Sequence, residues 1–156
     1  MLYSRFESIC RQYPQKVAIV FKGEQVTYQG LYDYMEHVCS LILNKVNQPM
    51  HETPIGFCIN RGWKMVAVMF AIMKVGGCYV PFDASYPMER LMHILRDVKP
   101  ALVIIDDGTP SEFLQQLELS QTQMTTILDD GVAVPSIDAV QHSNQLSSLA
   151  YIIYTS

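Results

Sequence analysis

Short apolar segments alternate with longer amphipathic segments along most of this chain, and this alternation constrains the fold more than any other feature. The short segments have the length and composition of β-strands, and the longer ones repeat apolar residues at helical spacing. Strands that alternate with helices are typical of α/β proteins, whose strands pair mostly in parallel. We therefore expect an α/β fold with mostly parallel strands.

The expected strands are short, and turn residues bound several of them. Lys22-Gly23-Glu24 predicts a hairpin-like turn between the first two strands. Proline has no backbone N–H, so Pro81 keeps its strand out of the centre of a sheet. Asp106-Asp107-Gly108 and Asp129-Asp130-Gly131 each follow a strand and are interpreted as ordinary turns. The strands are expected at residues 17–21, 25–27, 54–59, 79–82, 101–105, 125–128 and 149–154.

The first two expected helices flank the hairpin. One covers residues 4–13, begins on Ser4 and ends before Pro14. Its apolar face carries Phe6, Ile9 and Cys10. Thr27 opens the other, which runs to about Lys45. Its buried stripe consists of Leu31, Tyr34, Met35, Val38, Leu41 and Ile42.

Two further helices are expected downstream. Residues 63–75 are apolar over most of the helix circumference, which indicates a helix buried on all sides. Residues 87–98 begin with Pro87 near the first turn, where proline is tolerated. Residues 132–148 are rich in Ser, Gln and Asn, and we expect an exposed loop there.

Charge and hydropathy exclude two classes of partner. The net charge is −4 and there is no Lys/Arg cluster, so no nucleic-acid partner is expected. The longest apolar run, residues 65–73, is far shorter than the roughly 20 residues that span a bilayer. With no signal peptide after Met1, we expect a cytoplasmic protein. Only 17% of the residues are charged, against roughly 25% in soluble domains, which indicates a part of something larger.

No catalytic constellation or metal site follows from the residues alone. The cysteines lie at wide, unrelated intervals among apolar neighbours, as small buried hydrophobic residues do. The histidines show no ligand spacing, and no Ser-His-Asp set or complete phosphate loop can be assigned. These residues are Cys10, Cys39, Cys58 and Cys78, and His37, His51, His93 and His142.

Three segments resemble the core motifs of the adenylation domains of non-ribosomal peptide synthetases. VTYQGL, residues 26–31, is similar to L-T-Y-x-E-L. MKVGGCYVPFD, residues 73–83, with YPMERL, residues 86–91, is similar to L-K-A-G-G-A-Y-V-P-L-D followed by Y-P-x-E-R-L. LAYIIYTS, residues 149–156, is similar to the opening of L-A-Y-x-x-Y-T-S-G-[ST]-T-G-x-P-K-G. The three occur in order, and the resemblance covers nearly the whole chain from Phe6 onward.

The resemblance implies a fold and an activity. Residues 1–156 are expected to be the N-terminal portion of the large domain of an adenylate-forming enzyme, truncated at the start of the phosphate-binding loop. The complete domain uses ATP and Mg²⁺ to join an amino acid to AMP, then loads the phosphopantetheine thiol of a carrier protein. Only Thr155 and Ser156 of the loop are present, so we expect this chain alone to be inactive and to bind no ATP tightly. Its expected partners are the remainder of the adenylation domain and the carrier protein.

The matching positions in the first two motifs are expected to be structural. None is assigned a catalytic role or a metal. Gly30 stands where the family has Glu, so one arm of a capping box with Thr27 is missing. The expected structural residues are Thr27, Tyr28, Gly76, Gly77, Pro81, Asp83 and Arg90.

Two alternatives remain open on the sequence. The chain could be a non-catalytic interaction piece or one half of a split enzyme. It could also be a relative of acyl-CoA synthetases or of D-alanine–carrier-protein ligases, which the form of the second motif disfavours.

Overall fold

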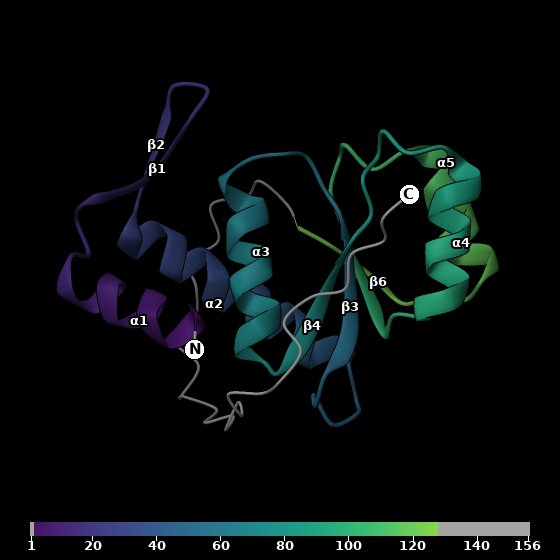
Figure 1. Ribbon diagram of the computed structural model, residues 1–156, viewed down its shortest axis with the longest axis horizontal. Coiled ribbons are helices and arrows are strands. Elements are labelled where there is room, and N and C mark those ends of the chain that lie inside the picture. Colours follow the sequence, from purple (N-terminus) through teal and green to yellow (C-terminus); the bar gives the residue numbers. More distant parts are fainter. Residues whose placement is uncertain (1, 128–156) are drawn as a thin grey trace.

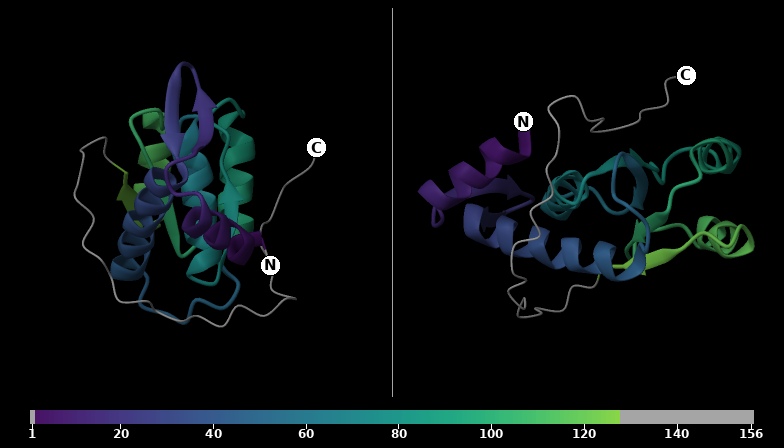
Figure 2. Two further views of the ribbon diagram at one scale, coloured as in Figure 1. Left: turned by 90° about the vertical axis from the view of Figure 1, so that its left-hand side faces the viewer. Right: turned by 90° about the horizontal axis from the view of Figure 1, so that it is seen from below.

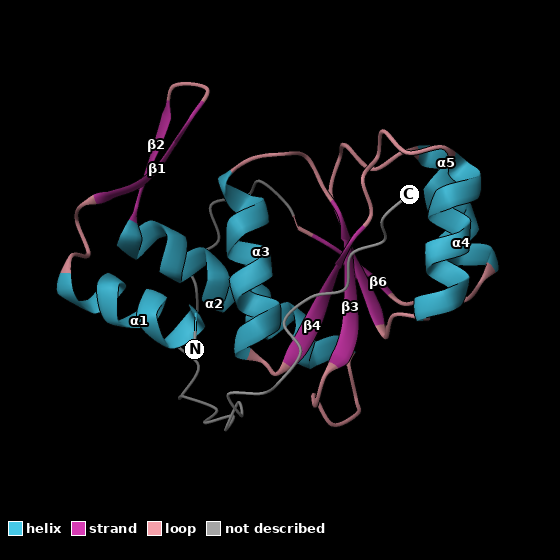
Figure 3. Ribbon diagram, in the orientation of Figure 1, coloured by secondary structure: helices cyan, strands magenta, loops and turns pink. Residues whose placement is uncertain are grey.

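The computed structural model describes residues 2–127, in which helices and strands alternate as expected (Figures 1 and 3). The elements are α1 Leu2–Gln12, β1 Val17–Phe21, β2 Glu24–Thr27, α2 Tyr28–Lys45, β3 Thr53–Cys58, α3 Trp63–Lys74, β4 Gly77–Pro81, α4 Met88–Val98, β5 Leu102–Ile105, α5 Ser111–Leu119 and β6 Met124–Thr126.

Four strands form one parallel sheet in the order β4-β3-β5-β6. Ile55 in β3 lies opposite Tyr79 of β4 on one side and Leu102 of β5 on the other. Every described pair in this sheet is parallel, which confirms the predicted α/β class. The strand that contains Pro81 lies at the end of the strand order, as its missing N–H requires.

Helices cover both faces of this sheet. Successive side chains of its strands point to opposite sides, so one strand contributes to two cores. In β5, Leu102 and Ile104 join the core beneath α1, α2 and α3, whereas Val103 joins the core beneath α4 and α5. Figure 2 shows α4 and α5 on one side of the sheet, with the N-terminal helices on the other. The prediction that α3 is buried on all sides is confirmed only in part. Ala67, Val68, Ala71 and Ile72 are buried, and its other residues are half-buried.

The hairpin of β1 and β2 forms a separate two-stranded antiparallel sheet. It stands away from the layered body, at the upper left of Figure 1. Its turn residues Lys22 and Gly23 have φ of +48° and +88°, as a two-residue hairpin turn of the primed type requires. The N–H groups of Tyr28 and Gln29 bond to the carbonyls of Lys16 and Pro14, which attaches α2 to the hairpin's base.

The N-terminal helix differs from its prediction. It begins at Leu2, so Ser4 lies inside it and does not cap it. The predicted apolar face is also partly wrong. Phe6 and Cys10 are buried, but Ile9 is 39% exposed. Phe6 stacks on Phe70 of α3, and Tyr3 packs against the same core. The inward stripe therefore consists of Tyr3, Phe6 and Cys10, which are three and four residues apart, and Ile9 lies outside it.

One helix was not expected at all. Residues Ser111–Leu119 form α5, with Pro110 at its N-cap and Phe113 and Leu117 fully buried. Its sequence, SEFLQQLEL, has four apolar residues, of which only Phe113 and Leu117 are buried.

Several expectations lie outside the described residues. These are the turn at residues 129–131, the loop at residues 132–148 and the strand at residues 149–154. Within residues 2–127, no helix is long and apolar enough to cross a membrane.

Candidate functional site at the carboxyl edge of the sheet

The strand order reverses between β3 and β5. After β3 the chain crosses α3 to reach β4 on one side, and then crosses α4 to reach β5 on the other side of β3. The two crossovers leave the sheet at this point toward opposite faces, so the carboxyl ends of β3 and β5 diverge into a crevice. In open α/β sheets, ligands bind in such crevices. Topology therefore directs attention to the residues that follow β3 and β5.

These residues form one hydrogen-bonded network. The backbone N–H of Asn60, after β3, donates to Oδ2 of Asp106, after β5, at 2.7 Å. The side-chain amide of Asn60 donates to Oδ1 of Asp107 at 3.0 Å. The N–H of Gly108 donates to Oδ1 of Asp106 at 2.9 Å. Both oxygens of Asp106 therefore accept backbone N–H groups, and the ends of the two strands are held together.

The Asn60 amide packs closely on Gly108. A Cβ built on Gly108 would lie 2.1 Å from Oδ1 of Asn60, so a larger residue would displace this amide from its bond to Asp107. Thr109, which is buried, donates its hydroxyl to the Cys58 carbonyl and accepts the N–H of Asp106 at 3.1 Å. The Asp-Asp-Gly segment is thus an ordinary turn in itself, as predicted, but it also joins two strands.

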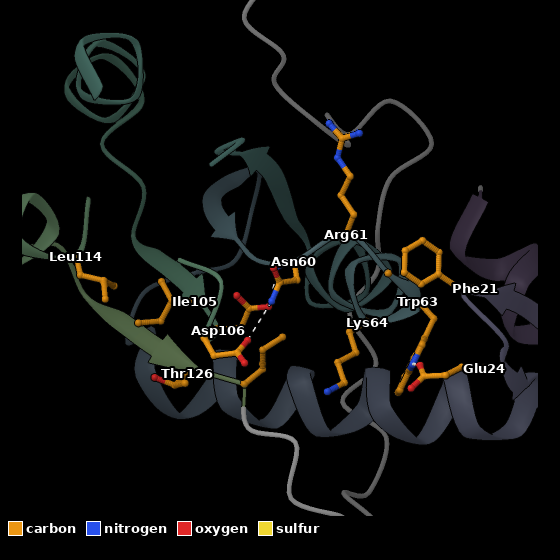
Figure 4. Close-up of a pocket in the computed structure, with 13 residues that line it drawn as sticks. Phe21, Glu24, Asn60, Arg61, Trp63, Lys64, Ile105, Asp106, Leu114 and Thr126 are labelled. Carbon is orange, nitrogen blue, oxygen red and sulfur yellow. Dashed lines mark hydrogen bonds between the residues drawn. The ribbon is translucent and has the colours of Figure 1, made fainter. Parts of the chain in front are cut away.

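A cleft of about 730 Å³ opens beside this network (Figure 4). Trp63 and Lys64, at the start of α3, form one wall, and the indole N–H of Trp63 donates to Oε2 of Glu24 in the hairpin at 3.2 Å. The lining residues are Phe21, Glu24, Asn60, Arg61, Gly62, Trp63, Lys64, Ile105, Asp106, Asp107, Leu114, Thr126 and Ile127.

Tyr34 of α2 supports the wall formed by α3. Its ring meets Trp63 edge-on, with centroids 4.9 Å apart, and the Nζ of Lys64 lies 5.8 Å from its centroid. Its hydroxyl is buried and has no hydrogen-bond partner among the described residues. Burial, with a smaller contribution from the charge of Asp106, raises the pKa of Tyr34 to about 12, so the phenol stays protonated at neutral pH.

The part of the second motif that follows β4 lies at the same edge of the sheet. Asp83 accepts the N–H and the hydroxyl of Ser85 at 2.9 and 2.7 Å, and its other oxygen lies 3.0 Å from Nη2 of Arg61. The bonds from Ser85, and then Arg61, hold the pKa of Asp83 below its usual range. Arg90 lies over the Tyr86 ring, 4.2 Å from its centroid. Both charged residues make local contacts, and Asp83 also links the loops after β3 and β4.

The two glycines of this motif serve different purposes. Gly76 has φ of +89° just after α3 and ends the helix in the left-handed region. Gly77 starts β4, where an added Cβ would lie 3.0 Å from the Thr53 carbonyl oxygen and 3.1 Å from Cγ2 of Ile72. Gly77 therefore permits close packing of β4 on β3 and α3, and does not itself end the helix.

The first motif lies far from the cleft network, at the base of the hairpin. Thr27 is the N-cap of α2, and its hydroxyl accepts the N–H of Gly30 at 3.1 Å. Tyr28 follows as the first helical residue. The remaining predicted site residues, Thr155 and Ser156, lie outside the described residues.

The described part of the site is not a phosphate cradle of free backbone N–H groups. Its lining mixes the carboxylates of Glu24, Asp106 and Asp107 with the cations of Arg61 and Lys64, whereas a phosphate loop presents unbonded backbone N–H groups. The N–H groups of Asn60 and Gly108 are already bonded to Asp106. Within residues 2–127 no group of three or more His, Cys, Asp or Glu could hold a metal ion.

The cysteines offer no nucleophile. Cys10, Cys39, Cys58 and Cys78 are all buried and unbonded to one another. Burial, above all, raises the pKa of the Cys58 thiol to about 12 and that of Cys10 to about 11, so both thiols are protonated at neutral pH.

The residues that line the cleft were not predicted as site residues. Asn60 and Asp106 each follow an apolar strand within two residues, which is a signal that sequence reasoning can detect. What it lacked was the strand order, because only the reversal between β3 and β5 makes these two strand ends a crevice.

Comparisons with known proteins show which families and proteins this chain is similar to. The model of the family described as AMP-binding enzyme matches residues 6–156. Gramicidin S synthase 2 of Brevibacillus brevis is 32% identical over 152 residues, which are 97% of this chain and 3% of the synthase. Tyrocidine synthase 3 of Brevibacillus parabrevis is 34% identical over 159 residues, which are 99% of this chain and 2% of that synthase.

A solved structure has the same fold. The nonribosomal peptide synthetase FmoA3, in its AMPPNP-bound form, matches with a TM-score of 0.80 at 23% identity, over 100% of this chain and 16% of that chain. The chain therefore spans a small part of each of these proteins.

Proposed function

Because this chain belongs to the AMP-binding enzyme family, we propose that it forms the N-terminal portion of an amino-acid-activating adenylation domain of nonribosomal peptide synthesis. The family match confirms the recognition drawn from the three motifs. The proposal adds what the complete domain does: it forms an aminoacyl-adenylate from ATP and an amino acid, then loads a carrier-protein thiol. The protein is proposed to act in the cytoplasm.

The observation that carries this proposal is the continuous family match over residues 6–156, which spans all three motifs in order. The names of the two synthases support peptide synthesis as the setting, and the AMPPNP in FmoA3 supports a nucleotide as co-substrate. The fold supports it as well, because Asp83 of the second motif and the cleft lie at the carboxyl edge of a parallel sheet, where α/β proteins bind ligands.

The role proposed for this chain is positional. ATP with Mg²⁺ would supply the activating phosphoryl chemistry in the complete domain. We propose that Thr155 and Ser156 begin the loop that would bind its phosphates. The network of Asn60, Asp106 and Gly108 fixes the sheet edge against which the rest of the domain is built.

The test is amino-acid-dependent ATP–pyrophosphate exchange. Residues 1–156 alone are expected to give no exchange above a heat-killed control with any of the twenty amino acids, because they lack donors for the transition-state charge. Coexpression with the part of the tyrocidine synthase 3 adenylation domain that follows the matched region should restore exchange. Exchange by the chain alone would contradict the proposed inactivity, and a stable pair without exchange would contradict the proposed function.

The alternatives are compared in the same assay. A non-catalytic interaction piece would bind the complementary polypeptide without exchange, whereas one half of a split enzyme would restore exchange, as the proposed fragment does. A relative of acyl-CoA synthetases or of D-alanine–carrier-protein ligases would restore exchange with a fatty acid or with D-alanine.

A further inference from the structure

A second hollow, of about 520 Å³, lies at the edge of the parallel sheet opposite to the candidate site. The residues that precede β5 and β6 line it, together with the last turn of α4 and the residues that follow α5. The carboxyl-edge cleft lies where the same two strands end. Figures 1 and 2 show α4 and α5 together on one face of the sheet, and the hollow lies between their C-terminal ends.

The polar lining of this hollow contains cations and neutral donors but no carboxylate. The carboxyl-edge cleft, in contrast, has Glu24, Asp106 and Asp107 in its lining. None of the described residues that line the second hollow is acidic, although the chain carries a net charge of −4. We call its six polar residues, each of which can donate a hydrogen bond, the amino-edge donor set: Arg96, Lys99, Ser120, Gln121, Thr122 and Gln123.

The described part of the chain does not neutralise the two cations of this set. Within residues 2–127, no carboxylate pairs with Arg96 or Lys99, whereas Arg61 and Lys74 each form an ion pair. The Nε of Arg96 donates to the Met92 carbonyl at 3.1 Å within α4. The two Nη groups of Arg96 and the ammonium of Lys99 are therefore left for a ligand.

The helix ends at the hollow do not need these cations for themselves. The N–H of Lys99 donates to the Leu95 carbonyl at the end of α4, and the N–H of Thr122 donates to the Leu117 carbonyl at the end of α5, both at 3.0 Å. These carbonyls therefore already have partners. Two helix C-termini still bring negative partial charge to this edge, so an anion can bind here only through both cations.

The charge and the size of the hollow indicate the class of ligand. A phosphate monoester carries about −1.5 to −2 charges at neutral pH and three acceptor oxygens, which match two cations surrounded by neutral donors. A carboxylate would leave one cation unmatched. Beside the donors the lining is apolar, with Leu95 and Pro100 buried and Ala101 half-buried. The volume is in the range of small-molecule sites, and the described lining has no aromatic side chain on which a nucleotide base could stack.

We infer that the amino-edge donor set binds a small phosphate monoester, with Arg96 and Lys99 on the phosphate and the carbon substituent against Leu95 and Pro100. This site lies at the opposite edge of the sheet from the candidate site, so its occupancy does not depend on the proposed function.

The test is equilibrium dialysis of residues 1–156 against phenyl phosphate, a method that tolerates association of the chain. We expect saturable binding of one phenyl phosphate per chain. Inorganic phosphate should bind more weakly because it does not reach the apolar lining, and benzoate more weakly because it carries a single charge. Arg96→Gln and Lys99→Gly should each weaken the binding of phenyl phosphate about tenfold or more.

The variants are chosen to keep the fold. Lys99 has φ of +48°, which glycine adopts readily, so Lys99→Gly removes the ammonium and preserves the end of α4. Lys45→Gln is the matched control: it removes one positive charge at the end of α2, which does not line the hollow, and should leave binding unchanged. Denaturant midpoints of each variant, compared with the parent, show whether a loss of binding is a loss of folding.

Each other outcome overturns the inference. An absence of saturable binding, or binding that Arg96→Gln and Lys99→Gly leave unchanged, would show that the donor set is not a site. An equal loss in Lys45→Gln would show attraction to the charge of the whole chain. Equal affinity for inorganic phosphate would contradict an ester as the ligand, and tighter binding of benzoate would contradict a phosphate.

Discussion

At the scale of single residues, the start of α2 has one of the two hydrogen bonds of a capping box. Thr27 caps the helix, and its hydroxyl accepts the N–H of Gly30 at 3.1 Å. Gly30 occupies the third helical position, where the family motif has Glu. Its φ is not in the left-handed region, and an added Cβ would meet Oγ1 of Thr27 at 3.5 Å and Cγ1 of Val26 at 3.6 Å, which are ordinary contacts. Nothing in the backbone therefore requires glycine here.

Replacing Gly30 should stabilise the chain. Gly30→Ala should raise the free energy of unfolding by up to about 0.5–1 kcal/mol through reduced backbone entropy of the unfolded state. Gly30→Glu should reach about 1 kcal/mol in total, because its carboxylate also favours the positive end of the helix and can bond back toward Thr27. Denaturant midpoints of the two variants and the parent, compared at equal slope, measure both effects. If neither variant gains stability, the helix does not begin as described.

At the scale of elements, the loops after β3 and β4 are joined by side chains. Asp83 bonds to Ser85 within its own loop and to Arg61 in the loop after β3. The hydrogen bonds from Ser85, with the neighbouring Arg61 charge, lower the pKa of Asp83. A carboxyl group with a lowered pKa stabilises the folded state above its unfolded pKa, and loses that contribution as pH falls through its folded value.

This predicts a pH-dependent effect of Asp83→Asn. Near neutral pH the variant should be less stable by at most about 1 kcal/mol, because the bridge to Arg61 is close to the surface. The difference from the parent should shrink as the pH falls below about 4, because the carboxyl group is protonated first in the unfolded parent and, at a lower pH, in the folded parent. Urea unfolding between neutral and acidic pH tests this, with Ser85→Ala as a partial loss. A difference that is constant with pH would show that the ionised carboxylate is not what stabilises the loop.

At the scale of the whole molecule, the distribution of exposed apolar residues determines how the isolated chain behaves. The apolar helix α3 is covered by α1, α2 and β4, and none of its residues is exposed. The exposed large apolar residues of the described chain are Leu2, Ile9, Tyr13, Val17, Val20 and Leu119.

Residues 1–156 alone are therefore expected to associate at micromolar concentration. Within residues 2–127 the second edge of β1 has no partner strand, and the exposed valines beside it promote association. Light scattering should show a polydisperse sample, which Val20→Lys improves and Leu119→Lys does not. A monodisperse monomer with one sharp melting transition would instead indicate a self-sufficient domain.

Local patterns in the sequence were enough to predict the α/β class, most element positions and the cap at Thr27. These predictions depend on residues that are close together in the chain. Apolar spacing predicts α2, the missing N–H of Pro81 predicts an edge strand, and Lys22-Gly23 predicts the hairpin turn. Local patterns failed at α5, where only Phe113 and Leu117 of the four apolar residues are buried.

Only the tertiary structure determined the strand order and therefore the site. Asn60 and Asp106 are 46 residues apart, and their hydrogen bond exists because β5 lies beside β3 and not beyond β4. The sequence does not distinguish the roles of Gly108 and Gly77. In the structure, Gly108 makes room for the Asn60 amide, and Gly77 makes room for a neighbouring strand. Likewise, the apolar sequence of β1, VAIVF, predicts a strand, but whether a second layer covers it depends on what packs against it. Strand order and coverage follow from packing between distant segments, which local propensity does not encode.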